Sequence, residues 1–186
     1  MISLRLGKIR LVFEFGFFVT AAVFCLLDDF GIAMTALCAC MIHETGHIIA
    51  AVICNVKIER ITFSFSGIKM LSESKVTAIS KDIFILLSGP LINLLTAYFY
   101  FHTGNYFPFS VNLILGIFNL LPFTSLDGGV ILKKLFEHFE IKPDLLIKTI
   151  ACITVILLLI IFKIYGIYNP AVYGIIIFLG VCELFY

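Results

Sequence analysis

The sequence predicts an all-α polytopic membrane protein with about six transmembrane helices and a small β-hairpin at the membrane edge. Two observations indicate this fold class. First, 61% of the 186 residues are hydrophobic, whereas soluble domains usually contain about 45–50% apolar residues. Second, apolar runs close to the ~20 residues that cross a bilayer recur along the whole chain. A chain of this length is predicted to form a single membrane-embedded domain over 1–186.

Six apolar segments account for most of the chain. The first begins after Arg5, Lys8 and Arg10 and so resembles a signal peptide. Glu14 inside this run, and the lack of a clear small-residue cleavage site, favour a retained helix instead. The predicted membrane helices are roughly 11–27, 30–54, 82–101, 107–123, 145–165 and 170–186.

The basic residues predict how these helices are oriented. Eleven of the thirteen lie before the first segment or in the loops that follow the second and fourth segments. The opposite loops, 28–29, 102–106 and 166–169, carry none. By the positive-inside rule, both termini are predicted to face the cytoplasm of what we expect to be a bacterial cell.

Two shorter elements are predicted on the cytoplasmic side. Residues 60–67, RITFSFSG, alternate apolar and polar side chains with the period of a strand, which predicts one strand of the hairpin. Residues 129–139 predict a short amphipathic helix on the inner surface, with Lys133 and Lys134 near lipid phosphates.

The sequence MIHETGHII, residues 41–49, places ionisable side chains inside the second apolar segment. Charge in a bilayer is costly, so such residues are functional candidates. His43 and His47 are four residues apart and therefore share one helical face. In H-E-x-x-H motifs two such histidines bind zinc and the glutamate, here Glu44, is the general base. The alternative is a pair of hydrogen-bonded interior histidines.

A catalytic zinc ion normally has three protein ligands and one open position. The predicted third ligand is Asp127, in NLLPFTSLDGGVIL, residues 119–132. There Pro122 interrupts a helix, and irregular backbone at membrane depth requires protein or water to satisfy it. An ordinary loop with an N-capping aspartate is the alternative. Four other acidic residues are conceivable ligands but sit alone in the sequence: Glu14, Asp28, Asp29 and Glu183.

Three segments together resemble a known family. HETGH (43–47), SGPLINLL (88–95) and NLLPFTSLDGG (119–129) match, in order and spacing, the signatures of the site-2 protease family of intramembrane zinc metalloproteases. VKIERITFSFSGIKM (56–70) and the single helix before HETGH are similar to the stage IV sporulation branch, which cleaves a membrane-tethered pro-sigma factor.

The resemblance implies a role for each matched residue. His43, His47 and Asp127 would bind one Zn²⁺ per chain, and Glu44 would be the catalytic base. Asn93 and Asn119 would contact the substrate backbone or the oxyanion, although each could instead bond a carbonyl beside a proline. The chain departs from the pattern at Val130, where a basic residue is usual, and at 123–125, where a second proline is common. The branch's C-terminal nucleotide-sensing domain and a PDZ-like insertion are absent from these residues.

The implied activity is hydrolysis of a peptide bond in or near a transmembrane segment of a membrane-tethered protein, such as a pro-sigma or anti-sigma factor. Such cleavage is called regulated intramembrane proteolysis. The expected partners are the lipid bilayer and the substrate, and no nucleic acid is expected. Whether a membrane-bound inhibitory protein also binds is an open alternative. A helix end near Cys54 puts the histidines about 10–16 Å below the inner surface, in the cytoplasmic half of the bilayer. Strand 61–65 would pair with the unwound substrate by β-addition, or else only plug the cytoplasmic opening.

Two other classes of function are compatible with the same residues. A membrane metal transporter could use these ligands as a transit site, although transporters often contain internal repeats, and we find none here. A catalytically inactive relative that binds membrane partners would not need Glu44.

Overall fold

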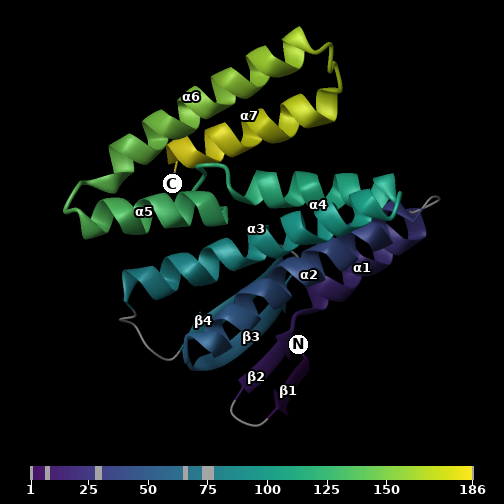
Figure 1. Cartoon of the computed structure of the whole chain (residues 1–186), viewed down its shortest axis with the longest axis vertical. Helices are drawn as coiled ribbons and strands as arrows, with labels where there is room; N and C mark the ends of the chain where they lie inside the picture. The colour runs from purple at the N-terminus through teal and green to yellow at the C-terminus, as the bar shows by residue number, and fades with distance from the viewer. Residues whose placement is uncertain (1, 7–8, 28–30, 65–66, 73–77, 186) are drawn as a thin grey trace. The chain divides into compact units, whose positions relative to one another are not determined.

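In a computed structural model of the chain, residues 2–6, 9–27, 31–64, 67–72 and 78–185 are described. As predicted, most of these residues are helical (Figure 1). Asp28 and Asp29 lie outside the described residues, and so do residues 65 and 66 of the predicted strand 60–67. The elements in chain order are β1 (Ile2–Leu6), β2 (Ile9–Phe13), α1 (Phe15–Leu27), α2 (Ile32–Ile53), β3 (Ile58–Ser64), β4 (Gly67–Ser72), α3 (Ile79–His102), α4 (Tyr106–Asn119), α5 (Asp127–His138), α6 (Pro143–Ile164) and α7 (Pro170–Phe185).

The chain divides into two compact units, Met1–Gly116 and Ile117–Tyr186. The first contains the four strands, α1, α2, α3 and most of α4. The second contains α5, α6 and α7. That 1–186 acts as a single domain remains a proposal.

Among the described residues, three helices are long and apolar enough to cross a membrane: α2, α3 and α6. Helices α4 and α7 are apolar but have only 14 and 16 residues. The six full-length spans expected from the sequence are therefore not shown. The first predicted helix, 11–27, begins only at Phe15, and its 13 residues rise about 20 Å against a hydrocarbon core of about 30 Å.

The residues before α1 form a strand because they pair with a distant part of the chain. Strand β2 joins β1 in an antiparallel hairpin and lies parallel to β3, and the amide of Glu14 donates to the carbonyl of Phe63 at 2.9 Å. Phe13 and Phe63 stack with ring centroids 4.4 Å apart. This N-terminal hairpin was not predicted.

The hairpin predicted after the second helix is confirmed as β3 and β4, which pair antiparallel. The four-stranded sheet has the order β1-β2-β3-β4. Strand β3 is therefore an inner strand with both edges hydrogen-bonded. The hypothesis that 61–65 pairs with a substrate by β-addition is wrong for this reason. The free edges of the described sheet belong to β1 and β4.

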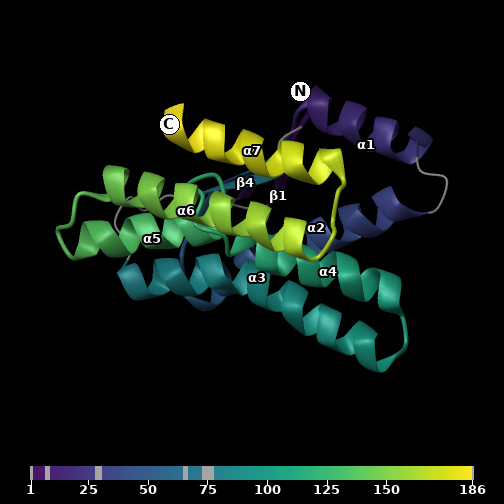
Figure 2. The same ribbon diagram turned by 90° about the horizontal axis from the view of Figure 1, so that it is seen from above.

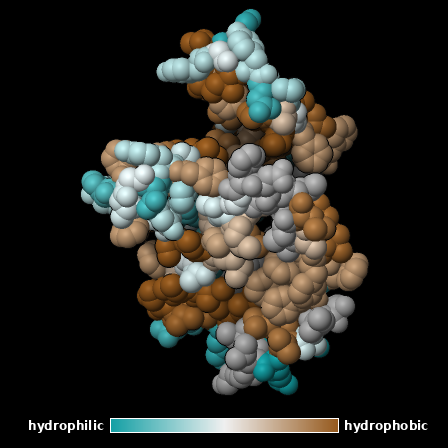
Figure 3. Space-filling model, turned by 90° about the vertical axis from the view of Figure 1, so that its right-hand side faces the viewer, coloured by the Kyte–Doolittle hydropathy of each residue, from teal (hydrophilic) through white to brown (hydrophobic). Residues whose placement is uncertain are grey.

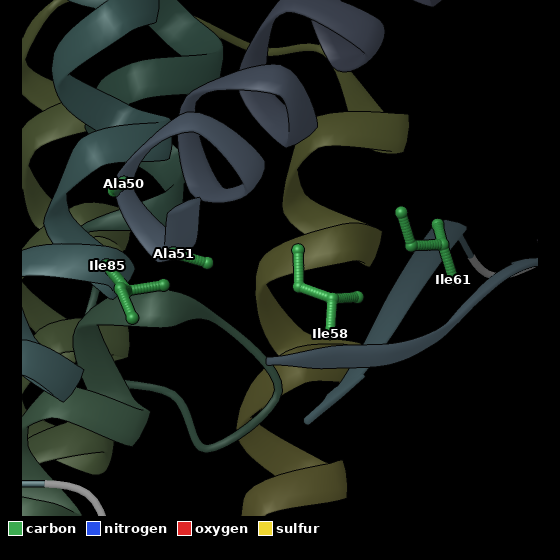
Figure 4. Packing of buried hydrophobic residues seen from close by; sticks show 5 residues of the cluster. All are labelled: Ala50, Ala51, Ile58, Ile61 and Ile85. Carbon is green, nitrogen blue, oxygen red and sulfur yellow. The ribbon is translucent and has the colours of Figure 1, made fainter. Parts of the chain in front are cut away.

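The core of the first unit lies where α2 and α3 meet the sheet. Figure 4 shows its buried residues, which come from α2 (Ala50, Ala51), β3 (Ile58, Ile61) and α3 (Ile85). Two alanines at the end of α2 leave room for the isoleucines of the sheet.

Helices α2 and α3 approach each other very closely at Gly46. A Cβ there would lie 2.6 Å from the backbone oxygen of Ser88. The glycine of HETGH therefore allows backbone-to-backbone contact with α3, and this contact brings α3 against the histidine face of α2.

In the second unit α6 and α7 form an antiparallel helical hairpin, and α5 packs on α6 (Figure 2). Helix α5 confirms the amphipathic helix predicted at 129–139. Pro143 occupies the first turn of α6, where a missing amide proton costs little.

Large apolar side chains are exposed on many helices. Figure 3 shows apolar residues over much of the molecular face that it presents. Tyr98 on α3, Leu157 on α6 and Phe178 on α7 are all more than half exposed. Exposed apolar surface on this scale is typical of a protein that contacts lipid.

Candidate metal centre

Helix α2 places both imidazoles on one buried face, as the spacing predicted. His43 is 6% exposed and His47 is 8% exposed. Their Nε2 atoms face each other at 3.0 Å. Two nitrogen atoms this close, each able to offer a lone pair, can bind the same metal ion.

The other nitrogen of each ring is held by α3. The Nδ1–H of His47 donates to the carbonyl oxygen of Ile85 at 2.7 Å. The Nδ1 of His43 lies 2.8 Å from Oδ1 of Asn93. Metal-binding histidines typically donate their second N–H to such an oxygen, which orients the ring and leaves Nε2 to coordinate.

The neighbours of Asn93 determine the tautomer of His43. Asn93 is fully buried, and its Nδ2 donates to the carbonyl oxygen of Ala39 at 3.0 Å and to Oδ1 of Asn112 at 2.9 Å. Asn112 in turn donates through Nδ2 to the carbonyl oxygen of Pro108 at 2.9 Å. With Nδ2 committed to two acceptors, Oδ1 must face His43. The proton of His43 is then on Nδ1, and Nε2 carries the lone pair that can bind a metal.

Asn112 was missed in the sequence. It lies in α4, is 2% exposed, and completes the hydrogen bonds of Asn93. The signal was present: a carboxamide in an apolar helix is costly unless it is hydrogen-bonded, so it marks a functional or structural contact.

Gly89 lies directly against both imidazoles. A Cβ at this position would clash with Nε2 of His47 and lie 2.8 Å from Nε2 of His43. The glycine of the SGPL motif thus leaves open the space beside the two Nε2 atoms.

Asp127 is the first residue of α5 and follows the irregular segment 120–126. Asp127 belongs to the second unit, and its carboxylate is the third donor that the sequence predicts beside His43 and His47. Two imidazole nitrogens and a carboxylate oxygen are a donor set of known catalytic zinc sites, which keep a further position open. The residues present therefore fit zinc.

Two further predicted site residues, Glu44 and Asn119, lie in helices α2 and α4. Glu44 is half-buried and follows His43 in α2. Asn119 is half-buried and is the last residue of α4. Contact of Asn93 or Asn119 with a substrate stays a prediction.

Asn93 gives a first test of this arrangement. We expect Asn93→Ala to weaken zinc binding roughly 10–100-fold, because His43 loses the acceptor that orients its ring. Competition with a chelator on the purified protein measures this. Asn105→Ala, in the exposed turn before α4, is the matched control. Unchanged zinc affinity in Asn93→Ala would show that the hydrogen bond does not support the site.

Comparison with known proteins points to one family. Residues 103–162 match the model of Peptidase family M50. The predicted zinc metalloprotease sll0528 of Synechocystis sp. is 29% identical over 106 residues, which make up 50% of this chain and 28% of that protein. The chain thus spans less than a third of that relative's length.

A solved structure shows the same fold. The site-2 protease from Methanocaldococcus jannaschii superposes with a TM-score of 0.65 at 20% sequence identity, over 98% of this chain and 93% of that one. The resemblance indicated by the three sequence motifs is therefore confirmed: residues 103–162 match Peptidase family M50, and the chain is similar in fold to a site-2 protease.

Proposed function

We propose that the chain is an intramembrane zinc metalloendopeptidase that hydrolyses a peptide bond in or near a transmembrane segment of a membrane-tethered protein. The observation that carries this proposal is the pair of buried histidines: their Nε2 atoms lie 3.0 Å apart, and the Nδ1 atom of each ring is hydrogen-bonded to an oxygen of α3. The M50 match supports the same class of enzyme.

His43, His47 and Asp127 would hold the metal. Zinc, when bound, supplies a Lewis acid that polarises the scissile carbonyl and lowers the pKa of a coordinated water toward about 7. Asn93 keeps the proton of His43 on Nδ1 and so keeps Nε2 available. Glu44 would accept a proton from the attacking water and pass it to the leaving amine.

The place of the histidines in α2 supports cleavage near one membrane surface. Helix α2 ends at Ile53, so His47 and His43 lie about 9 and 15 Å from that end at about 1.5 Å per residue. The positive-inside rule assigns this end, and both termini, to the cytoplasm. An extended substrate would then have to pair with a free sheet edge, β1 or β4.

We further propose a pro-sigma or anti-sigma factor as the substrate class, by analogy with the sporulation proteases. The support is the resemblance of residues 56–70 to that branch. A metal transporter or an inactive relative has no supporting observation in the described residues.

The proposal is tested by purifying the full chain in detergent and by co-expressing it with single-span membrane proteins. We expect about one zinc ion per chain and release of a cytoplasmic fragment. Asp127→Asn should bind zinc with much lower but still measurable affinity and release no fragment, because the carboxylate ligand is gone. Asp144→Asn, an exposed aspartate in the first turn of α6, should lose neither. A zinc-free wild-type protein, or equal zinc in both variants, would refute the proposed site.

A further inference from the structure

Glu183 is a buried acid that the proposed chemistry does not use. It lies near the end of α7 and is 5% exposed. An unpaired carboxylate in an apolar setting is strongly disfavoured. Its presence there therefore requires a partner.

The partner is Thr124. The backbone N–H and the side-chain O–H of Thr124 both donate to Oε2 of Glu183, each at 2.9 Å. Both residues belong to the second unit, 59 positions apart in the chain. The two hydrogen bonds join the end of α7 to the backbone and to the side chain of the same residue.

Thr124 lies in the irregular segment 120–126, which connects α4 to Asp127 (Figure 1). Two backbone hydrogen bonds fold this segment back on itself. The amide of Phe123 donates to the carbonyl oxygen of Leu121 at 2.9 Å, and the amide of Leu126 donates to the carbonyl oxygen of Phe123 at 2.8 Å. Glu183, from α7, accepts the hydrogen bond of the Thr124 amide and so adds a contact from another helix to the hydrogen bonds within the segment.

The same segment packs against the first turn of α5. A Cβ at Gly128 would lie 2.7 Å from the carbonyl oxygen of Leu121, and a Cβ at Gly129 would lie 2.7 Å from the amide nitrogen of Thr124. The backbone of Thr124 therefore packs against Gly129 and donates a hydrogen bond to Glu183. Asp127 lies between these contacts in the sequence.

We propose that Glu183 is a positioning residue for Asp127, an inference that rests on the proposed zinc site. The carboxylate fixes Thr124, Thr124 fixes the first turn of α5 through Gly129, and that turn begins with Asp127. The end of α7 thereby sets where the third ligand is presented. In this proposal Glu183 acts through Thr124, as a positioning residue and not as a ligand.

The test measures zinc affinity of the full chain by chelator competition, with zinc alone as the probe. Glu183→Leu removes the acceptor and should weaken zinc binding roughly 10–100-fold. Glu183→Gln keeps an oxygen for Thr124 without the charge and should lose less. Thr124→Val keeps the backbone N–H and should also lose less. Glu137→Gln, an exposed acid in α5, should bind zinc as the wild type does.

A double-mutant cycle separates positioning from a general structural role. If Glu183 acts through Asp127, Glu183→Gln should cause no further loss of zinc affinity once Asp127→Asn is present. Additive losses, or wild-type affinity in Glu183→Gln, Glu183→Leu and Thr124→Val alike, would overturn the inference. A wild-type chain that binds no zinc would instead refute the proposed function, and the two failures are therefore distinguishable.

Discussion

Glu44→Gln is expected to retain zinc and to lose cleavage. Glutamine has nearly the shape of glutamate, so His43 and His47 on the same helix should keep their places. The amide cannot accept the proton of the attacking water, and general base catalysis of this kind contributes roughly 10²–10⁴-fold to rate. Both zinc content and the rate of fragment release should be measured on the same purified protein.

Three outcomes would change the interpretation of Glu44. Cleavage at the wild-type rate in Glu44→Gln would mean that Glu44 is not the base. Loss of zinc together with cleavage would mean that Glu44 supports the site's structure. Zinc flux that is unaffected by the substitution would favour a transporter. The control is Glu59→Gln, an exposed glutamate in β3.

Gly89→Ala is expected to abolish zinc binding. A methyl group at this position would lie 2.5 Å from Cε1 of His47 and 2.8 Å from Nε2 of His43, well inside ordinary contact distances of about 3.5–4.0 Å. The rings cannot easily move aside, because Ile85 and Asn93 hold their Nδ1 atoms. Zinc content and chelator competition would show a loss larger than that of Asn93→Ala.

Gly174→Ala is the matched control for this substitution. Gly174 lies in helix α7, and a Cβ there would meet no atom within 4 Å. The change should leave zinc binding intact and raise the free energy of unfolding by about 0.5–1 kcal/mol, because alanine is the better helix former. Wild-type zinc affinity in Gly89→Ala would contradict the position of the imidazoles.

The prediction of the histidine face succeeded because it depends only on local geometry. Any helix through 41–49 places positions 43 and 47 one turn apart. The helix interruption at Pro122 was equally local, since proline lacks the amide proton that a helix interior needs. α4 accordingly ends at Asn119, and α5 begins at Asp127.

Predictions failed where a segment's structure depends on a distant partner. Residues 11–13 were predicted to begin the first helix, yet they belong to β2 because β3, about 50 residues later, supplies a parallel neighbour. The substrate role suggested for strand 61–65 failed for the same reason. A strand's period can be recognised from its residues, whereas its place within a sheet cannot.

The sequence by itself therefore determined the apolar helices, the spacing of His43 and His47, and the break before Asp127, all of which follow from covalent spacing and backbone stereochemistry. The tertiary structure alone decided which buried amides and carboxylates face each other. Asn93 meets Asn112 and His43, and Glu183 meets Thr124. Helix packing brings together side chains that are far apart in the chain. A polar residue in an apolar segment indicates that a hydrogen-bond partner must exist, but the sequence does not identify that partner.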